Sequence, residues 1–195
     1  AFIVSIFTPA LYIALTTHNQ EALPLPFLLN FMAQRESVPF SALTEALFMS
    51  ISFEILRESD IRKQSSTGSA VSILGGLILG DAAVSAGIIS PIMIIVISIS
   101  AISGLAFSSQ EMIASLRWLR FLMMFLAMFF GIFGIYIGFL FLLSSLVTTK
   151  ALDYPYFAPF SPLVKEELGD AIIKLRSSKR LKRNPLLTKN KERGN

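Results

Sequence analysis

The sequence contains no cysteine and a single histidine, His18. Without cysteine the chain can form neither a disulfide nor a thiolate metal site. One histidine cannot build a multi-histidine metal site, and it argues against a histidine-centred catalytic triad. The sequence also has no P-loop motif, no HExxH zinc motif and no GxSxG nucleophile elbow. Since these absences leave no starting point for an enzyme, we expect no catalytic residues, no metal and no cofactor.

Charged residues are scarce as well. They make up 15% of the 195 residues, whereas soluble domains average about 25%. Hydrophobic residues account for 53% of the chain, and the mean hydropathy is +0.65. This composition excludes an ordinary soluble domain and is typical of an integral membrane protein.

Apolar segments separated by polar connections predict an all-α, polytopic membrane protein with about four to five membrane helices. The first segment begins at Ala1 without a basic region or an initiating methionine, so we expect the chain to be part of a longer one. The last would be about 43 Å long at 1.5 Å per residue, and it would have to tilt in a hydrocarbon core about 30 Å thick. The predicted helices cover residues 1–17, 39–60, 69–87, 91–107 and 119–147.

Turn residues delimit two of these helices. Pro39 is expected in the first turn of its helix, where its missing N–H group costs nothing. Gly87, Ser90 and Pro91 interrupt the apolar run and predict a helical hairpin, with Gly87 capping the first arm and Ser90 capping the second. A re-entrant hairpin that does not cross the bilayer fully is the alternative. A polar loop is expected over residues 59–68.

The end of the chain has a different composition. Residues 153–162, DYPYFAPFSP, contain three prolines and predict an extended segment at the membrane surface. A short amphipathic helix is expected to follow from Ser161, with one apolar face formed by Leu168, Ile172 and Leu175. We therefore divide the chain into a membrane domain, residues 1–149, and a cytoplasmic part, residues 150–195, that ends in a basic tail.

The basic tail sets the expected orientation. Nine of the 17 Lys and Arg residues lie between Lys174 and Arg193. Because such an excess marks the cytoplasmic side, we expect a cytoplasmic C-terminus and binding to anionic lipids rather than to nucleic acid. Counting back through full spans then places three basic residues outside, which conflicts with the same rule: Arg57, Arg62 and Lys63.

The predicted helix over residues 39–60 carries carboxylates in an apolar setting, where each costs about 2.5 to 3.5 kcal/mol if it lies mid-bilayer. At 100° per residue, one polar stripe contains Ser41, Glu45, Phe48 and Ser52. We expect this stripe to line or gate a pore, with Glu45 in a ring of carboxylates that favours cations. The alternative for Glu45 is a single acid that is protonated or hydrogen-bonded to a neighbouring helix.

Other polar and small residues fall outside that stripe. Glu54 is expected to pair with Arg57, three residues along the helix. Asp81 is a second membrane acid, which would face either a partner subunit or an ion path. Small residues at three- and four-residue spacing favour close helix packing in the last apolar segment. They are Gly131, Gly134 and Gly138.

Four segments of the sequence resemble the membrane region of the GerA family, the A subunits of spore germinant receptors. They are ALTTHNQEALPLP, RESVPFSALTEALFMSISFEILRE, GSAVSILGGLILGDAAVSAGIISP and YPYFAPFSP. The resemblance extends from Thr8 to Pro162, in the expected order, and is looser afterwards. One position departs from the family pattern, since Ser50 stands where a carboxylate is common, and this puts a second acid ring at that level in doubt.

The resemblance implies a nutrient-gated cation channel in the spore inner membrane, built from several A subunits. It further implies a permease-like B subunit and a lipoprotein C subunit as partners, and a cytoplasmic N-terminal region that this sequence lacks. Two alternatives stay open from the residues. The chain could be a transporter-like subunit that binds the germinant directly, or a structural scaffold of the receptor complex.

Overall fold

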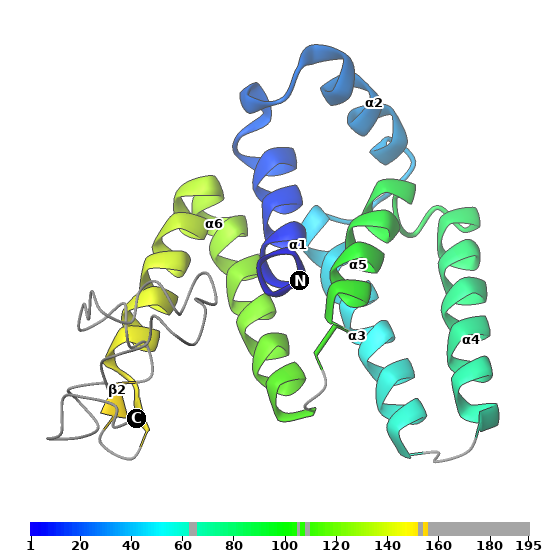
Figure 1. Ribbon diagram of the computed structural model, residues 1–195. Coiled ribbons are helices and arrows are strands. Elements are labelled where there is room, and N and C mark those ends of the chain that lie inside the picture. The colour runs from blue at the N-terminus through cyan, green and yellow to red at the C-terminus, as the bar shows by residue number, and fades with distance from the viewer. Residues whose placement is uncertain (63–65, 105, 108–109, 152–153, 156–195) are drawn as a thin grey trace, which may run out of the picture. The chain divides into compact units, whose positions relative to one another are not determined.

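The computed structural model describes residues 1–62, 66–104, 106–107, 110–151 and 154–155. Among these residues the chain forms six α-helices, one turn of 3-10 helix and a short two-stranded ladder (Figure 1). The predicted all-α class is therefore confirmed. By its internal contacts the chain divides into two compact units, residues 1–138 and 139–195.

Little of the predicted cytoplasmic part falls within the described residues. Strand β1 (Lys150–Ala151) pairs antiparallel with strand β2 (Tyr154–Pro155), which belongs to the proline-rich segment. The rest of that segment, the amphipathic helix and the basic tail lie outside the described residues, so these predictions stay predictions.

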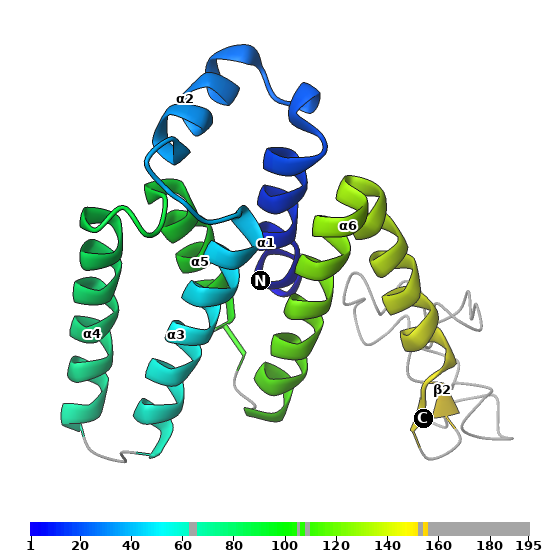
Figure 2. The same ribbon diagram turned by 180° about the vertical axis from the view of Figure 1, so that it is seen from behind.

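The core of the first unit lies where α1 (Phe2–Thr17), α3 (Ala42–Arg62) and α5 (Pro91–Gly104) meet, and Figures 1 and 2 show these helices together at the centre of that unit. Helix α1 packs mainly on α5. The buried apolar residues of α1 recur at helical spacing, which gives one continuous buried stripe. They are Ile6, Ala10, Ile13 and Ala14, and across from them α5 buries Met93 and Ile97.

A 3-10 turn, η1 (Gln20–Ala22), and Pro24 lead from α1 into α2 (Leu25–Arg35). Helix α2 is not among the helices predicted from the sequence. No residue of α2 is buried. One aromatic contact holds it toward α1, between the rings of Tyr12 and Phe31, whose centroids are 5.9 Å apart. Helix α2 is therefore a loosely covered element at the surface of the unit.

Helix α3 begins at Ala42, three residues later than expected, so the placement of Pro39 in its first turn was wrong. The side chain of Ser41 explains the start, because its Oγ accepts a hydrogen bond from the N–H of Thr44 at 3.3 Å and so caps the helix. At its other end α3 continues to Arg62, and α4 (Ser66–Ser85) starts soon after. The loop expected over residues 59–68 is shorter, since residues 59–62 contain no glycine or proline to stop α3, and α4 already includes Gly68.

The connection between α4 and α5 follows the prediction closely. Gly87 has a φ of +65°. Its N–H donates to the carbonyl of Val84 at 2.9 Å, and the N–H of Ile88 donates to that of Ala83 at 3.0 Å. These two bonds form a Schellman motif, which uses glycine because a side chain at positive φ is strained. Pro91 then opens α5, as expected. Helix α4 packs on α3.

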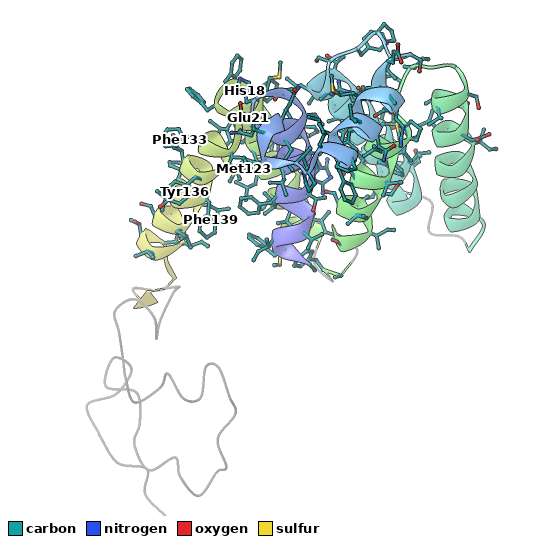
Figure 3. All side chains as sticks on the ribbon, turned by 90° about the horizontal axis from the view of Figure 1, so that it is seen from above. His18, Glu21, Met123, Phe133, Tyr136 and Phe139 are labelled. Carbon is teal, nitrogen blue, oxygen red and sulfur yellow. The ribbon has the colours of Figure 1, made fainter. Side chains whose placement is uncertain are left out.

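Helix α6 (Gln110–Thr148) contains a sharp reversal that the sequence prediction missed. Gly131 has φ +61° and ψ −141°, values that are not helical and that suit glycine alone. Asn19 stabilises the turn, because its Oδ1 accepts the N–H of Ile132 at 3.0 Å. The expected single tilted helix over residues 119–147 is therefore two helical arms that meet at Gly131. Figure 3 shows His18 near this turn, with Phe133 and Tyr136 along the second arm.

The two arms of α6 approach closely just after the turn. A Cβ atom added at Gly134 would collide with the backbone oxygen of Leu126 in the first arm. One added at Gly138 would lie 2.5 Å from the Sδ of Met123. Gly134 and Gly138 therefore lie on the face of the second arm that is turned toward the first.

By length and hydropathy, one helix among the described residues could cross a membrane, Glu111–Thr148 within α6. Helices α1 and α5 are apolar but shorter. Because α6 reverses at Gly131, this helix is not one straight span, and the expected number of spans stays a prediction.

Candidate functional site

The candidate site is centred on Glu45, in the first turn of α3. Glu45 is the acidic residue of that turn, and only 1% of it is exposed, so its carboxylate is buried. Its Oε2 accepts two hydrogen bonds from Ser90, one from the backbone N–H and one from the Oγ hydroxyl, both at 2.8 Å. Its Oε1 lies 3.3 Å from a terminal nitrogen of Arg35 at the end of α2. One carboxylate therefore joins α2, α3 and the start of α5.

The start of α5 is a suitable place for this carboxylate. The first N–H groups of a helix have no partner within it, and the helix dipole leaves partial positive charge there. Ser90 is the residue before α5, and Pro91 after it has no N–H to offer. Glu45 therefore provides from another helix both the hydrogen-bond acceptor and the negative charge that this terminus needs.

Tyr12 of α1 lies at the edge of the same group. It is 5% exposed, and its buried hydroxyl has no hydrogen-bond partner within the part of the chain that the structure describes. A buried hydroxyl of this kind costs free energy unless it is paired. The Nε of Arg35 is also buried, and no described residue pairs with it. The cluster formed by Tyr12, Arg35, Glu45 and Ser90 is therefore polar, interior and incompletely satisfied.

The structure separates the members of the predicted pore stripe. Glu45 points into the cluster, whereas Phe48 is 48% exposed. Ser41 is exposed and caps the helix, and Ser52 is half-buried. Within this chain, Glu45 therefore does not share an open surface with Ser41 and Phe48.

Glu54 and Arg57, which lie outside the predicted pore stripe of α3, contact other helices. Glu54 lies 2.6 Å from Arg117 of α6, and Arg57 donates to the carbonyl of Ala101 in α5 at 3.2 Å. The expected pairing of Glu54 with Arg57 was wrong, because α6 brings a different guanidinium to the carboxylate. Asp81, the other acid considered, is exposed on α4.

Arg120 is a buried residue that the sequence reasoning missed. It is 5% exposed, whereas Trp118, two residues earlier in the same helix, is 77% exposed. The guanidinium donates to Ser5 of α1, through Nε to the backbone oxygen at 3.1 Å and through a terminal nitrogen to Oγ at 3.0 Å. A signal was present in the sequence, because Arg120 falls on the buried apolar stripe of α6 that contains Ile113, Leu116, Met124 and Ala127.

Comparisons with known proteins agree with the resemblance noted in the sequence. The family model of the Bacillus/Clostridium GerA spore germination protein matches residues 1–186. Spore germination protein KA of Bacillus subtilis is 39% identical over 174 residues, which cover 89% of this chain and 32% of that protein. Spore germination protein GerQA of Bacillus cereus is 34% identical over 193 residues, which cover 99% of this chain and 38% of that protein.

A further relative in Bacillus subtilis, the uncharacterized membrane protein YfkQ, is 40% identical over 171 residues, covering 88% of this chain and 33% of that protein. The chain thus spans about a third of the length of these curated relatives. No solved structure matches the chain.

Proposed function

Because the chain belongs to the GerA family of spore germination proteins, we propose that it is the membrane region of a germinant-receptor A subunit. In this proposal several copies assemble in the spore inner membrane, with a permease-like B subunit and a lipoprotein C subunit, around a path for monovalent cations. The chain crosses the membrane several times, its C-terminus is cytoplasmic, and its basic tail contacts anionic lipids.

The observation that carries the channel proposal is the uncovered face of α3. Phe48, Ile51 and Ile55 recur at helical spacing and are about half exposed, or more, in this chain. Polar residues stand at both ends of the same face, with Thr44 before these three and Ser59 after them. A helix with an apolar middle and hydroxyl-bearing ends can form a hydrophobic constriction between wetter mouths, which is one way that pores gate.

In this arrangement we assign different tasks to the residues of the predicted stripe. Phe48 lies at the constriction, and Ser41 and Ser52 lie beside the path. Glu45 supports the helix from behind, because its carboxylate is engaged by Ser90 and Arg35. The receptor therefore needs Glu45 for the position of α3 rather than as a ligand for the passing cation.

Cation release from spores tests the proposal. Spores carrying Phe48→Ala in the full-length protein should release potassium at an altered rate, in response to the nutrient mixture that germinates wild-type spores. The matched control is Trp118→Ala, which truncates an exposed aromatic residue on another helix. Unchanged release in Phe48→Ala and Ser52→Leu spores, at normal protein abundance, would contradict a path along α3 and favour a scaffold.

A further inference from the structure

An open cavity of about 660 Å³ lies between the end of α1 and α2. Its walls are mostly apolar side chains of α2, such as Leu28 and Phe31, and it lies within the size range of small-ligand sites. Four polar residues line it: Thr16, Gln20, Arg35 and Glu36.

Two of these polar residues already donate hydrogen bonds to nearby backbone carbonyls. The hydroxyl of Thr16 donates to the carbonyl of Tyr12 at 2.8 Å, and the Nε2 of Gln20 donates to the carbonyl of Thr16 at 2.8 Å. Arg35 and Glu36 are left as the groups that could orient a bound molecule.

Arg35 has more donors than partners. A guanidinium carries five N–H groups, and the contact to Glu45 at 3.3 Å engages one terminal nitrogen. Among the described residues, the buried Nε has no hydrogen-bond partner. The side chain is 20% exposed, and Arg35 is one of the residues that line the cavity. A planar carboxylate is the group that fits such a fork of N–H donors. Glu36 on the same wall opposes a ligand with a second negative charge.

We propose that this cavity binds a small monocarboxylate with an apolar body, and that the carboxylate pairs with Arg35. The apolar body would lie against Leu28 and Phe31. The effect of this ligand on signalling rests on the proposed receptor function. Binding of the ligand to the cavity does not depend on a channel.

The consequence follows from the position of Arg35 between two carboxylates. Glu45 already holds one side of the guanidinium and also caps α5 through Ser90. A ligand carboxylate would compete with Glu45 for the guanidinium of Arg35. A bound ligand would therefore weaken the Arg35–Glu45 contact, which connects α2 to the start of α5 through Glu45 and Ser90. A ligand shifts a conformational equilibrium through such differential contacts.

Ligand-detected NMR on the full-length protein in lipid nanodiscs tests the site, with butyrate and butyramide as the probes. These two molecules have nearly the same shape, but only butyrate is charged. We expect butyrate to bind about tenfold more tightly than butyramide, or better, because it forms charge-assisted hydrogen bonds. Arg35→Gln should weaken butyrate binding by a similar factor. Arg117→Gln removes an equivalent ion-paired arginine outside this cavity and should leave it unchanged.

A second variant keeps the test valid if Arg35→Gln does not fold. Ala33→Trp retains both Arg35 and Glu45, fills the cavity with an indole ring and should prevent butyrate binding. Equal affinity for butyrate and butyramide, or wild-type binding by a folded Arg35→Gln or Ala33→Trp protein, would overturn the site. Binding lost in those variants supports the site even if spores with Phe48→Ala release cations normally. That second result would overturn the channel alone.

Discussion

Removing the carboxylate of Glu45 should destabilise the protein more than removing the charge of an exposed acid does. In Glu45→Ala, Ser90 loses two hydrogen bonds to a charged acceptor, and such bonds contribute about 1.5 to 3 kcal/mol each. Arg35 also keeps a partly buried charge without its partner. Breaking a buried pair in this way costs about 3 to 5 kcal/mol, so we expect a loss of that size. Glu45→Gln keeps an oxygen for Ser90 and should cost about 1 to 3 kcal/mol.

The measurement is the free energy of unfolding of the full-length protein, from SDS titration in mixed micelles. Glu21→Gln is the matched control, since Glu21 is an exposed acid in η1 and its change should stay within about 0.5 kcal/mol of wild type. A double-mutant cycle between Glu45→Gln and Arg35→Gln should give a coupling of about 0.5 to 3 kcal/mol.

The two roles considered for Glu45 give opposite results in this experiment. A carboxylate that caps α5 predicts a lower stability in Glu45→Gln and a measurable coupling to Arg35. A carboxylate that only lines a pore predicts wild-type stability with altered ion selectivity. If Glu45→Gln matches the Glu21→Gln control and the cycle gives zero, the account of the cluster is wrong.

Three further predictions concern other parts of the first unit. Gly131→Ala should cost about 1 to 3 kcal/mol, because a side chain at this backbone conformation is strained, and a wild-type midpoint in SDS titration would argue against the reversal of α6. Arg120→Ala should cost about 2 to 4 kcal/mol in the same assay through lost packing and unpaired buried oxygens, whereas Trp118→Ala should change little; equal effects would contradict the burial of Arg120. A cycle between Glu54→Gln and Arg117→Gln should give about 0.2 to 1 kcal/mol, as the pair is partly exposed, and raising the salt concentration should reduce it.

Local signals in the sequence predicted the parts of the fold that depend on neighbouring residues. The turn at Gly87 and the start of α5 at Pro91 were predicted from single residues. Glycine adopts a positive φ without strain, and proline fits the first turn of a helix because its missing N–H is not needed there. The reversal at Gly131 was missed because no local signal marks it. Its neighbours are apolar on both sides, and the residue that stabilises it, Asn19, is far away in the chain.

The candidate site could be predicted only in part. The cost of a carboxylate in an apolar helix identified Glu45 as important, and a hydrogen bond to a neighbouring helix was one of the two interpretations. Its partners could not be read from the sequence, because Ser90 and Arg35 reach it through tertiary packing. For Glu54, the sequence suggested a local ion pair with Arg57. In the structure its carboxylate pairs with Arg117 of α6, which tertiary packing brings to it.

The reversal of α6 changes the parity of the membrane topology. If both arms cross the bilayer, the chain crosses twice where a straight helix crosses once, and every element before Gly131 exchanges sides relative to a cytoplasmic C-terminus. Arg57 and Arg62, which the straight helix had placed outside, then fall on the cytoplasmic side together with Arg117, as the positive-inside rule requires. The cavity lined by Arg35 would then open on the opposite, outer side of the membrane. On that condition, the backbone conformation of a single glycine would decide which compartment each end of the bundle faces.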